Sequence, residues 1–329
     1  MRHLSRRAAL ALPLGIGGLP LTARADEWKP NQPVRILVPA APGGTTDVMA
    51  RLLAQRLLAR WGSSVVVENK AGAGGTIGTL EMVRARPDGS TLMSGNIGPQ
   101  AIAYSLFRNL PYRAEQITCI AGTIRGPNVL VVNNGVAARN VAELVALLRS
   151  RPGQVSYAST GVGQSTHLSP VLMLQMLNAQ AIHVPFRGSG PAQIDLLAGH
   201  VNFLIDNLTG VMEHIRAGRV RALAVTGAER SPQLPDVPAM RETMPELAGY
   251  EVNTWFGIFG PAGLPPAVVQ GVNAEVNAWL DLPETRQRFT DLGGVALRLS
   301  PEGFADFVAA ETRKWGEVVR REGIQVDAG

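Results

Sequence analysis

Two glycine-rich loops supply the first candidate chemistry of this chain. One, at residues 41–47, reads APGGTTD, and the other, at residues 71–76, reads AGAGGT. Glycine lets a backbone approach a ligand closely, and the free N–H groups at the start of a helix attract anions. Two such loops in one half of the chain favour a carboxylate site, although each alone is equally consistent with a tight connection. The candidate ligand-binding residues are Ala41, Gly43, Gly44, Thr45, Thr46, Asp47, Gly74, Gly75 and Thr76.

Three polar loops in the middle of the chain form a second candidate group. They start at Ser159, Arg187 and Asp206, and each follows a predicted strand. Their hydroxyl and amide groups can bind a polar organic ligand, and the Arg187 guanidinium can pair with a carboxylate through two hydrogen bonds. Structural roles explain the same residues equally well. Arg187 can be a surface arginine, Asp206-Asn207 can be turn residues or a helix cap, and His167 can simply begin a helix. The candidates are Ser159, Thr160, Thr166, His167, Arg187, Gly188, Asp206 and Asn207.

Catalytic and metal-binding patterns have less support. Ser165 lies two residues before His167, but no G-x-S-x-G motif surrounds a serine, so a serine hydrolase is a minor alternative. The five histidines form no H-E-x-x-H or Cys/His pattern, and we therefore predict no metal site. Cys119, the single cysteine, lies in an apolar run and is predicted to be an inert buried thiol.

A dinucleotide-binding fold is the competing interpretation of the second glycine loop. Residues 72–78 read GAGGTIG and follow a predicted strand, but Ile77 stands where the G-x-G-x-x-G fingerprint requires glycine. Ser94-Gly95-Asn96 occupies the place where such a fold needs an acidic residue. An oxidoreductase is therefore a distant third hypothesis, and no cofactor is predicted.

The elements that must position these loops alternate between strand and helix. An apolar run from Val34 to Val38 precedes the first glycine loop, and a helical pattern from Asp47 to Trp61 follows it. The same order repeats to about Val225. Such alternation predicts an α/β fold with mostly parallel sheets covered on both faces, in which ligands bind at the carboxyl ends of the strands.

The chain is long enough for two lobes. After Val225 it is rich in proline, and then a helix opened by Ser300-Pro301-Glu302 carries an apolar stripe with Phe304 and Trp315. A tail that returns to cover the first lobe makes that lobe discontinuous. We expect a first lobe of residues 26–128 and 224–329, a second lobe of residues 129–223, and two crossing strands as a hinge.

The first twenty-five residues read as an export signal. Arginines precede an apolar stretch from Ala8 to Leu21 that is too short to span a bilayer, and residues 23–25, Ala-Arg-Ala, fit a small-x-small cleavage site. We expect cleavage after Ala25 and a periplasmic location. Ser5-Arg6-Arg7 matches part of a twin-arginine signal, so both the Sec and the Tat routes stay open. A short anchor helix is the minor alternative.

Removal of this segment changes the charge of the protein. It holds four of the 31 basic residues and no acidic residue, so 27 basic residues face 26 acidic ones and the formal charge falls from +5 to +1. A balanced charge without a basic run argues against a nucleic-acid partner. One cysteine allows no intramolecular disulfide, so stability must come from the core.

The chain after the export signal resembles the Bug-type substrate-binding proteins of tripartite tricarboxylate transporters over nearly its whole length. Several segments match in family order. They are Pro42-Gly43-Gly44-Thr45-Thr46-Asp47, Val67-Glu68-Asn69-Lys70-Ala71-Gly72-Ala73-Gly74-Gly75, Asn109-Leu110-Pro111-Tyr112, Tyr157-Ala158-Ser159, His183-Val184-Pro185-Phe186-Arg187-Gly188, Asp206-Asn207 and Leu234-Pro235-Asp236-Val237-Pro238.

This resemblance implies a two-lobed periplasmic-binding-protein fold of type II, the Venus-flytrap fold, that closes on a small organic acid. It implies delivery of the acid to the membrane subunits of the transporter, without catalysis, by a protein that we expect to be a monomer. It also implies that the two first-lobe loops hold the carboxylate, partly through water, while the second-lobe candidates discriminate between acids. The chain departs from the family at Ala40-Ala41, where an aromatic residue and a proline are common, and at Arg187, where lysine is common. A binding protein that serves a sensor is the alternative within this fold.

Overall fold

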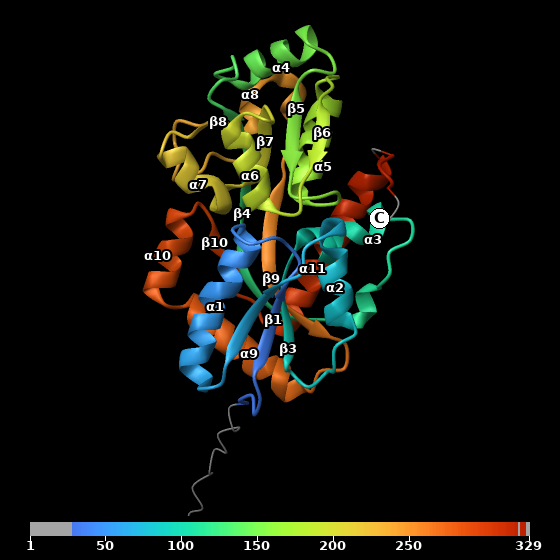
Figure 1. Ribbon diagram of the computed structural model, residues 1–329, viewed down its shortest axis with the longest axis vertical. Helices are drawn as coiled ribbons and strands as arrows, with labels where there is room; N and C mark the ends of the chain where they lie inside the picture. The colour runs from blue at the N-terminus through green and yellow to red at the C-terminus, as the bar shows by residue number, and fades with distance from the viewer. Residues whose placement is uncertain (1–27, 322, 327–329) are drawn as a thin grey trace, which may run out of the picture.

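The computed structural model describes residues 28–321 and 323–326, so the expected export signal lies outside the described residues. Two lobes lie one above the other in Figure 1, and strands β4 (Ile117–Asn133) and β9 (Asn253–Pro261) connect them. The protein therefore has the two-lobed architecture that we expected. In the described part of the chain, no helix is long and apolar enough to cross a membrane.

The first lobe, at the bottom of Figure 1, has a sheet with helices on both faces. Its remaining strands are β1 (Val34–Val38), β2 (Val65–Asn69), β3 (Thr91–Asn96) and β10 (Val295–Ala296). Its helices are α1 (Thr45–Trp61), α2 (Thr76–Val83), α3 (Ala103–Leu106), α9 (Pro266–Leu280), α10 (Pro283–Asp291) and α11 (Pro301–Arg321). Shorter helical turns are Ala73–Gly75, Gly98–Ile102 and Ala114–Gln116.

The second lobe repeats this layered arrangement with shorter elements. Its strands are β5 (Ser156–Ser159), β6 (Ile182–Pro185), β7 (Phe203–Asn207) and β8 (Val220–Val225). Its helices are α4 (Val141–Ser150), α5 (Ser165–Met176), α6 (Ser189–Ala198), α7 (Leu208–Arg216) and α8 (Met240–Thr243), with a turn at Pro245–Leu247.

Strand β4 belongs to both lobes. The sequence has separate strand-like runs at residues 117–123 and 129–132, whereas the structure has one strand of 17 residues. Its residues up to Pro127 pair antiparallel with β9, and its residues from Asn128 onward pair antiparallel with β7 and β8. The peripheral strands pair in parallel, β1 with β2 and β3, and β5 with β6 and β7. The loops after these parallel strands meet between the lobes.

The core of the first lobe follows from the alternation of side chains along β1. Ile36 and Val38 point to the face covered by α1, where Leu53 and Leu57 are buried, while Leu37 points to the opposite face. All five side chains are fully buried. Burial on both faces explains why the strand reads as a continuous apolar run rather than an alternating one.

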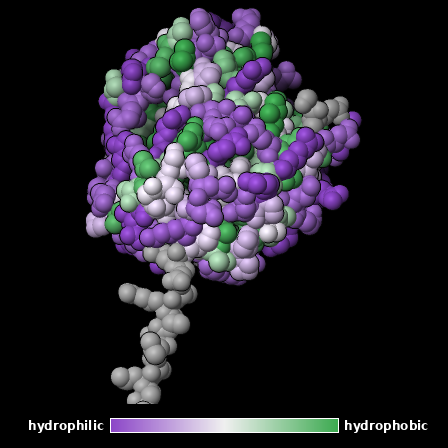
Figure 2. Space-filling model, turned by 60° about the horizontal axis from the view of Figure 1, so that its bottom comes forward, coloured by the Kyte–Doolittle hydropathy of each residue, from purple (hydrophilic) through white to green (hydrophobic). Residues whose placement is uncertain are grey.

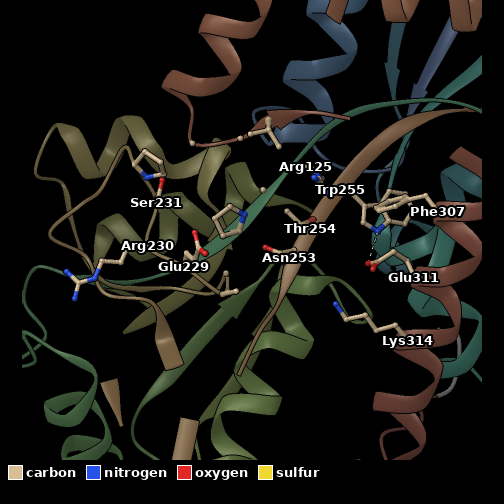
Figure 3. Close-up of a pocket in the computed structure, with 18 residues that line it drawn as sticks. Arg125, Glu229, Arg230, Ser231, Asn253, Thr254, Trp255, Phe307, Glu311 and Lys314 are labelled. Atoms are coloured by element: carbon tan, nitrogen blue, oxygen red, sulfur yellow. Dashed lines mark hydrogen bonds between the residues drawn. The ribbon is translucent and has the colours of Figure 1, made fainter. Parts of the chain in front are cut away.

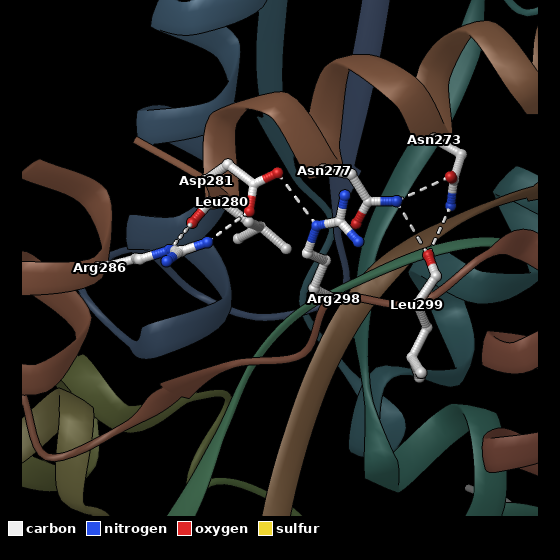
Figure 4. Close-up of polar contacts among 7 residues, drawn as sticks. All are labelled: Asn273, Asn277, Leu280, Asp281, Arg286, Arg298 and Leu299. Atoms are coloured by element: carbon white, nitrogen blue, oxygen red, sulfur yellow. Dashed lines mark hydrogen bonds and ion pairs between the residues drawn. The ribbon is translucent and has the colours of Figure 1, made fainter. Parts of the chain in front are cut away.

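The C-terminal helix covers the first lobe, as predicted. Gly303 donates its N–H to the Ser300 hydroxyl, 3.1 Å away, at the start of α11, whose apolar stripe is buried. The segment before α11 is fixed to α9, because Asn273 and Asn277 donate their side-chain amides to the carbonyl oxygen of Leu299 at 3.0 Å. Figure 4 shows these bonds beside a second set of contacts, in which Asp281 accepts from Arg286 and Arg298.

The segment between β8 and β9 differs from expectation. The proposed boundary at residue 224 assigned it to the first lobe, but α8 packs against α4 and β8 of the second lobe. The buried Tyr250 donates its hydroxyl to the carbonyl oxygen of Ser169 in α5, 2.9 Å away. Apolar residues among the prolines hold this segment on the second lobe until the chain returns along β9.

The surface seen in Figure 2, with the bottom of the first lobe turned forward, is mainly hydrophilic with scattered apolar residues. Such scattering is typical of a solvated protein face.

Candidate functional site

A narrow cavity lies between the lobes. Its volume is about 20 Å³, which leaves room for one or two waters. Within the described residues, its wall contains polar and apolar groups but no charged side chain. The lining residues are Ala40, Gly44, Thr45, Thr46, Asn96, Thr160, Gln164, Ser165, Gly188, Ser189, Asn207, Thr254 and Phe256.

Four helices begin at this wall. The residues just before α1, α5, α6 and α7 are Gly44, Gln164, Gly188 and Asn207, and all four line the cavity. No described side chain caps any of these four N-termini; α2, α9 and α10 are likewise uncapped, whereas Asn140 caps α4. Uncapped helix starts present free N–H donors and a partial positive charge. The cavity is therefore an electropositive site built without a cationic side chain.

The first glycine loop is held in place by Asp47. This buried carboxylate accepts the backbone N–H of Gly43 at 3.1 Å and the side chains of Arg51 and Asn69 at 3.0 and 2.9 Å. Burial alone raises the pKa of Asp47, but these hydrogen bonds lower it below its usual value. Asp47 thus positions the loop, while Thr45 and Thr46 reach the cavity.

The second glycine loop lies outside the cavity lining and contacts the other lobe. The carbonyl oxygen of Gly74 accepts from the Gln164 side chain at 2.7 Å, and a Cβ at Gly74 would collide with the carbonyl oxygen of Val162. Gly75 also adopts a positive φ, and the Thr76 hydroxyl donates to its own turn at Ala73. The structure therefore gives this loop a closing contact between the lobes.

Two further contacts join the lobes beside the cavity. The backbone N–H of Ala41 donates to the carbonyl oxygen of Arg187 at 2.8 Å, and the hydroxyls of Thr45 and Thr209 lie 2.8 Å apart. The Arg187 side chain is exposed and does not line the cavity, so its backbone makes the described contact. With these contacts in place, the lobes are closed on each other.

Asp206 lies behind the second-lobe wall rather than in it. Its fully buried carboxylate accepts from the Ser189 hydroxyl at 2.7 Å, from Gln193 at 2.7 Å and from the N–H of Asn207 at 2.8 Å. Burial raises the pKa of Asp206. Because Ser189 gives its proton to this carboxylate, its oxygen presents lone pairs to the cavity.

A stack of rings supports the loop from Ser159 to Thr166. His167 stacks on His183 at 4.4 Å, His183 stacks on Tyr157 at 4.8 Å, and the His183 Nε2 atom lies 2.7 Å from the Ser159 hydroxyl. Burial, followed by the neighbouring His183, lowers the pKa of His167 to about 3, and burial lowers the pKa of His183 to about 4. Both rings are neutral near pH 7. Across the loop, the hydroxyls of Thr160 and Thr166 lie 2.8 Å apart.

The environment of Ser165 and His167 differs from that of a catalytic serine–histidine pair. His167 Nδ1 lies 3.4 Å from the backbone N–H of Gly163, and within the described residues no hydrogen bond joins His167 to Ser165. A histidine with so low a pKa is a weak general base. Cys119 lies half-buried in β4, and burial raises the pKa of its thiol to about 12.

Sequence reasoning missed several lining residues. Asn96 ends strand β3 and donates to the Thr46 hydroxyl at 3.2 Å, so the rule that ligands bind at strand ends applies to it as well. Gln164 and Ser189 lie in loops that were recognised as polar, beside the residues that were chosen. Thr254 and Phe256 come from the crossing strand β9, where the sequence holds no signal for the face that meets the cavity.

Comparison with known proteins agrees with this geometry. BugT of Bordetella pertussis is 35% identical over 97% of this chain and 98% of its own length. The R. palustris protein Rpa4515, solved with adipate, superposes with a TM-score of 0.87 at 33% identity, covering 90% of this chain and 99% of that one. MatC from Rhodopseudomonas palustris, solved with bound malate, gives a TM-score of 0.84 at 34% identity, over 88% and 99% of the two chains.

The family model described as "Tripartite tricarboxylate transporter family receptor" matches residues 49–324. This match includes β4, β9 and the second lobe, and it begins inside α1. Two lobes, an intervening cavity and a family match over most of the chain lead to one assignment. The chain belongs to the tripartite tricarboxylate transporter receptor family, whose members are solute-binding receptors.

Proposed function

We propose that this receptor closes around a small organic acid and passes it to the membrane subunits of a tripartite tricarboxylate transporter. The observation that carries the proposal is the convergence of four uncapped helix N-termini on one cavity. Their N–H groups bind a carboxylate without the cost of burying a cationic side chain. The acids in the titles of the two similar structures, adipate and malate, support this ligand class.

The hydroxyl groups of the cavity add a preference within that class. Thr46 accepts from Asn96, so its own proton is free for a ligand oxygen. Ser189 gives its proton to Asp206 and can only accept. An acid that carries a hydroxyl group satisfies both lobes, because its carboxylate accepts from Thr46 and its hydroxyl donates to Ser189.

The expected site residues take different roles in this proposal. Gly44, Thr45, Thr46, Thr160, Gly188 and Asn207 contact the acid, as lining residues of the cavity. Asp47, Asp206 and His167 position these groups from behind. Ala41, Gly43, Gly74, Gly75, Thr76, Ser159, Thr166 and the backbone of Arg187 shape the loops that close over it.

Closure of the lobes about the crossing strands is the proposed mechanism. In this proposal the first lobe comprises residues 26–128 and the chain from β9 onward, and the second lobe comprises residues 129–223 together with α8. The closed cavity, with room for one or two waters, has to widen to admit an acid. An acid held by N-termini from both lobes then favours such a closed form over the open one and shifts the equilibrium toward it.

Calorimetric titration with malate, adipate, citrate and the uncharged diamide of malic acid tests the ligand class. We expect at least one acid to bind and the diamide to fail, because the helix N-termini favour negative charge. Binding of the diamide as tightly as malate would exclude a carboxylate site. Absence of binding by every acid tested, in a folded sample, would refute the proposed ligand class.

Binding without catalysis completes the proposal. Ser165 lines the cavity, but the low pKa of His167 and the absence of a described bond between them leave it without a base. Hydrolysis of para-nitrophenyl esters that is lost in Ser165→Ala would contradict this. Loss of acid uptake by cells lacking the gene, restored by the intact gene, would support delivery to the transporter over signalling.

Location and oligomeric state follow from the same proposal. We propose export and cleavage after Ala25, so that the periplasmic protein begins at Asp26, and a monomer in solution. Amino-terminal sequencing of protein from the periplasmic fraction tests the first statement. Light scattering coupled to gel filtration tests the second, and a mass of twice the chain would overturn it.

A further inference from the structure

A second and larger pocket lies behind the crossing strands. Its volume is about 440 Å³, compared with about 20 Å³ for the cavity between the lobes. Side chains on a strand alternate between faces, so Trp255 and Phe256, neighbours on β9, belong to different sites. Phe256 lines the cavity between the lobes, and Trp255 lines this rear pocket (Figure 3).

The rear pocket combines apolar walls with unpaired positive charge. Phe307 of α11 meets Trp255 edge to face at 5.5 Å, and Val295 is 54% exposed at the margin. Lys314 and Arg125 also line the pocket, and within residues 28–321 and 323–326 no acidic side chain pairs with either. Figure 3 shows Lys314 extending from α11 toward the crossing strands.

Two carboxylates, Glu229 and Glu311, also line the pocket, and in the described part of the chain neither forms an ion pair with Lys314 or Arg125. Glu311 accepts from the Trp255 indole N–H at 3.1 Å, and Arg230 pairs with Glu242 outside the pocket at 2.7 Å. Glu229 lies on the far wall in Figure 3, away from Lys314. A ligand for this pocket needs an apolar ring against Phe307 and Val295 and a negative group near Lys314 and Arg125. An aromatic carboxylate has both parts, and a pocket of this size admits one.

The two sites share the hinge. The rear pocket is bounded on one side by residues 227–232, which follow β8 of the second lobe, and on the other by residues 293–295 and α11 of the first. Rotation about β4 and β9 that opens the cavity between the lobes brings these rear walls together. The structure shows the corresponding closed arrangement, with a narrow cavity in front and a wide pocket behind.

We propose that the rear pocket is a second ligand site, for a small aromatic carboxylate, and that its occupant favours the closed form of the receptor. A molecule in this pocket holds the rear walls apart and so resists opening of the lobes. By linkage, the same molecule raises the affinity of the cavity for its own ligand, and the cavity ligand raises the affinity of the rear pocket.

Crystals of the full mature protein with para-iodobenzoate test the location, because the iodine gives an anomalous peak. We expect the peak beside Phe307 with the carboxylate at Lys314 or Arg125. In solution, Lys314→Glu is expected to weaken binding by about tenfold or more, the value of a charge-assisted hydrogen bond. Arg313→Glu is the matched control, since it makes the same charge change at the adjacent exposed residue and leaves binding unchanged. Arg125→Glu provides a second variant, and circular dichroism confirms that each variant is folded.

Small-angle X-ray scattering tests the coupling in the absence of any cavity ligand. Saturation with para-iodobenzoate is expected to reduce the radius of gyration of the wild-type protein and to leave that of Lys314→Glu unchanged. An iodine peak found only between the lobes, or equal binding by Lys314→Glu and Arg313→Glu, would overturn the rear site. A radius that stays constant or increases while the rear pocket is occupied would overturn the stabilisation of the closed form.

Discussion

Gln164 of the second lobe donates its side-chain amide to the carbonyl oxygen of Gly74 in the first lobe, with 2.7 Å between Nε2 and O. Gln164 is also the residue before α5, where a side chain often caps the helix, but here it caps nothing. Its amide reaches across the cleft instead, and of the first-turn N–H groups of α5 only that of His167 has a described partner, the carbonyl oxygen of Gln164. Gln164 thus stabilises the closed arrangement of the lobes without capping the N-terminus of α5.

Replacement of Gln164 by leucine is expected to weaken acid binding. Gln164→Leu removes a part-buried hydrogen bond between the lobes and leaves the Gly74 carbonyl unpaired in the closed form, which corresponds to about tenfold in affinity. Calorimetric titration measures the change. Gln154→Leu, at an exposed position of the same lobe, is the control. Equal affinity in Gln164→Leu and wild type would show that this contact does not contribute to closure.

A methyl group at Gly74 is expected to prevent full closure. Gly74 and Gly218 have φ values of +62° and +64°, but an added Cβ collides with Val162 at Gly74 and meets nothing within 4 Å at Gly218. Gly74→Ala and Gly218→Ala should therefore each lose about 1 kcal/mol of stability from backbone strain. Titration should show a large loss of acid binding in Gly74→Ala alone. A similar loss in both variants would assign the effect to strain.

Acid should destabilise the second lobe through its stacked histidines. The pKa of His167 falls from 6.5 in the unfolded chain to about 3 in the folded protein, so the unfolded state binds the extra proton between these values. Stability is fully present above pH 6.5 and decreases as the pH falls, by up to about 1.4 kcal/mol per pH unit from His167. Urea unfolding across this range should give a smaller slope in His167→Gln than in wild type. His200→Gln, at an exposed histidine of the same lobe, should keep the wild-type slope.

Asp206→Asn is expected to cost about 2 kcal/mol of unfolding free energy. Three donors converge on the buried carboxylate, and the amide of asparagine presents a donor to at least one of them. Asp195→Asn, on the outer part of α6, should change stability by less than about 0.5 kcal/mol. Denaturation with urea distinguishes the two. A neutral effect of Asp206→Asn would show that the carboxyl is already protonated at the pH of the experiment.

The parts of the fold that could be predicted are those with local signals. Asn140 followed by Glu143 is a sequence signal for the start of α4, and in the structure the Glu143 N–H donates to the Asn140 side chain, whose amide donates to the Glu143 carboxylate. A continuous apolar run predicted β1, and similar runs mark both segments of β4. That these segments form one strand could not be seen, because Gly126-Pro127 in the middle reads as a break and only the change of pairing partner keeps the strand extended.

The candidate site was partly predictable for a related reason. Strand ends and glycine loops mark Thr46, Gly188 and Asn207, which line the cavity. The side that a residue presents depends on tertiary packing, so the sequence did not separate Asp206, buried behind the wall, from Ser189, which lies in it. Arg187 carries the most evident charge for an acid, yet its side chain is exposed while its backbone makes the closing contact.

The use of helix N-termini has an evolutionary consequence. Backbone N–H groups remain when a side chain is replaced, so single substitutions other than to proline leave the anion-holding groups of this receptor intact. The hydroxyl side chains around them can change without loss of these N–H donors, whereas Gln164 is also needed for closure. A gene duplicate can therefore acquire a new acid as its ligand through changes at a few wall positions, while the capacity to hold a carboxylate is inherited with the fold.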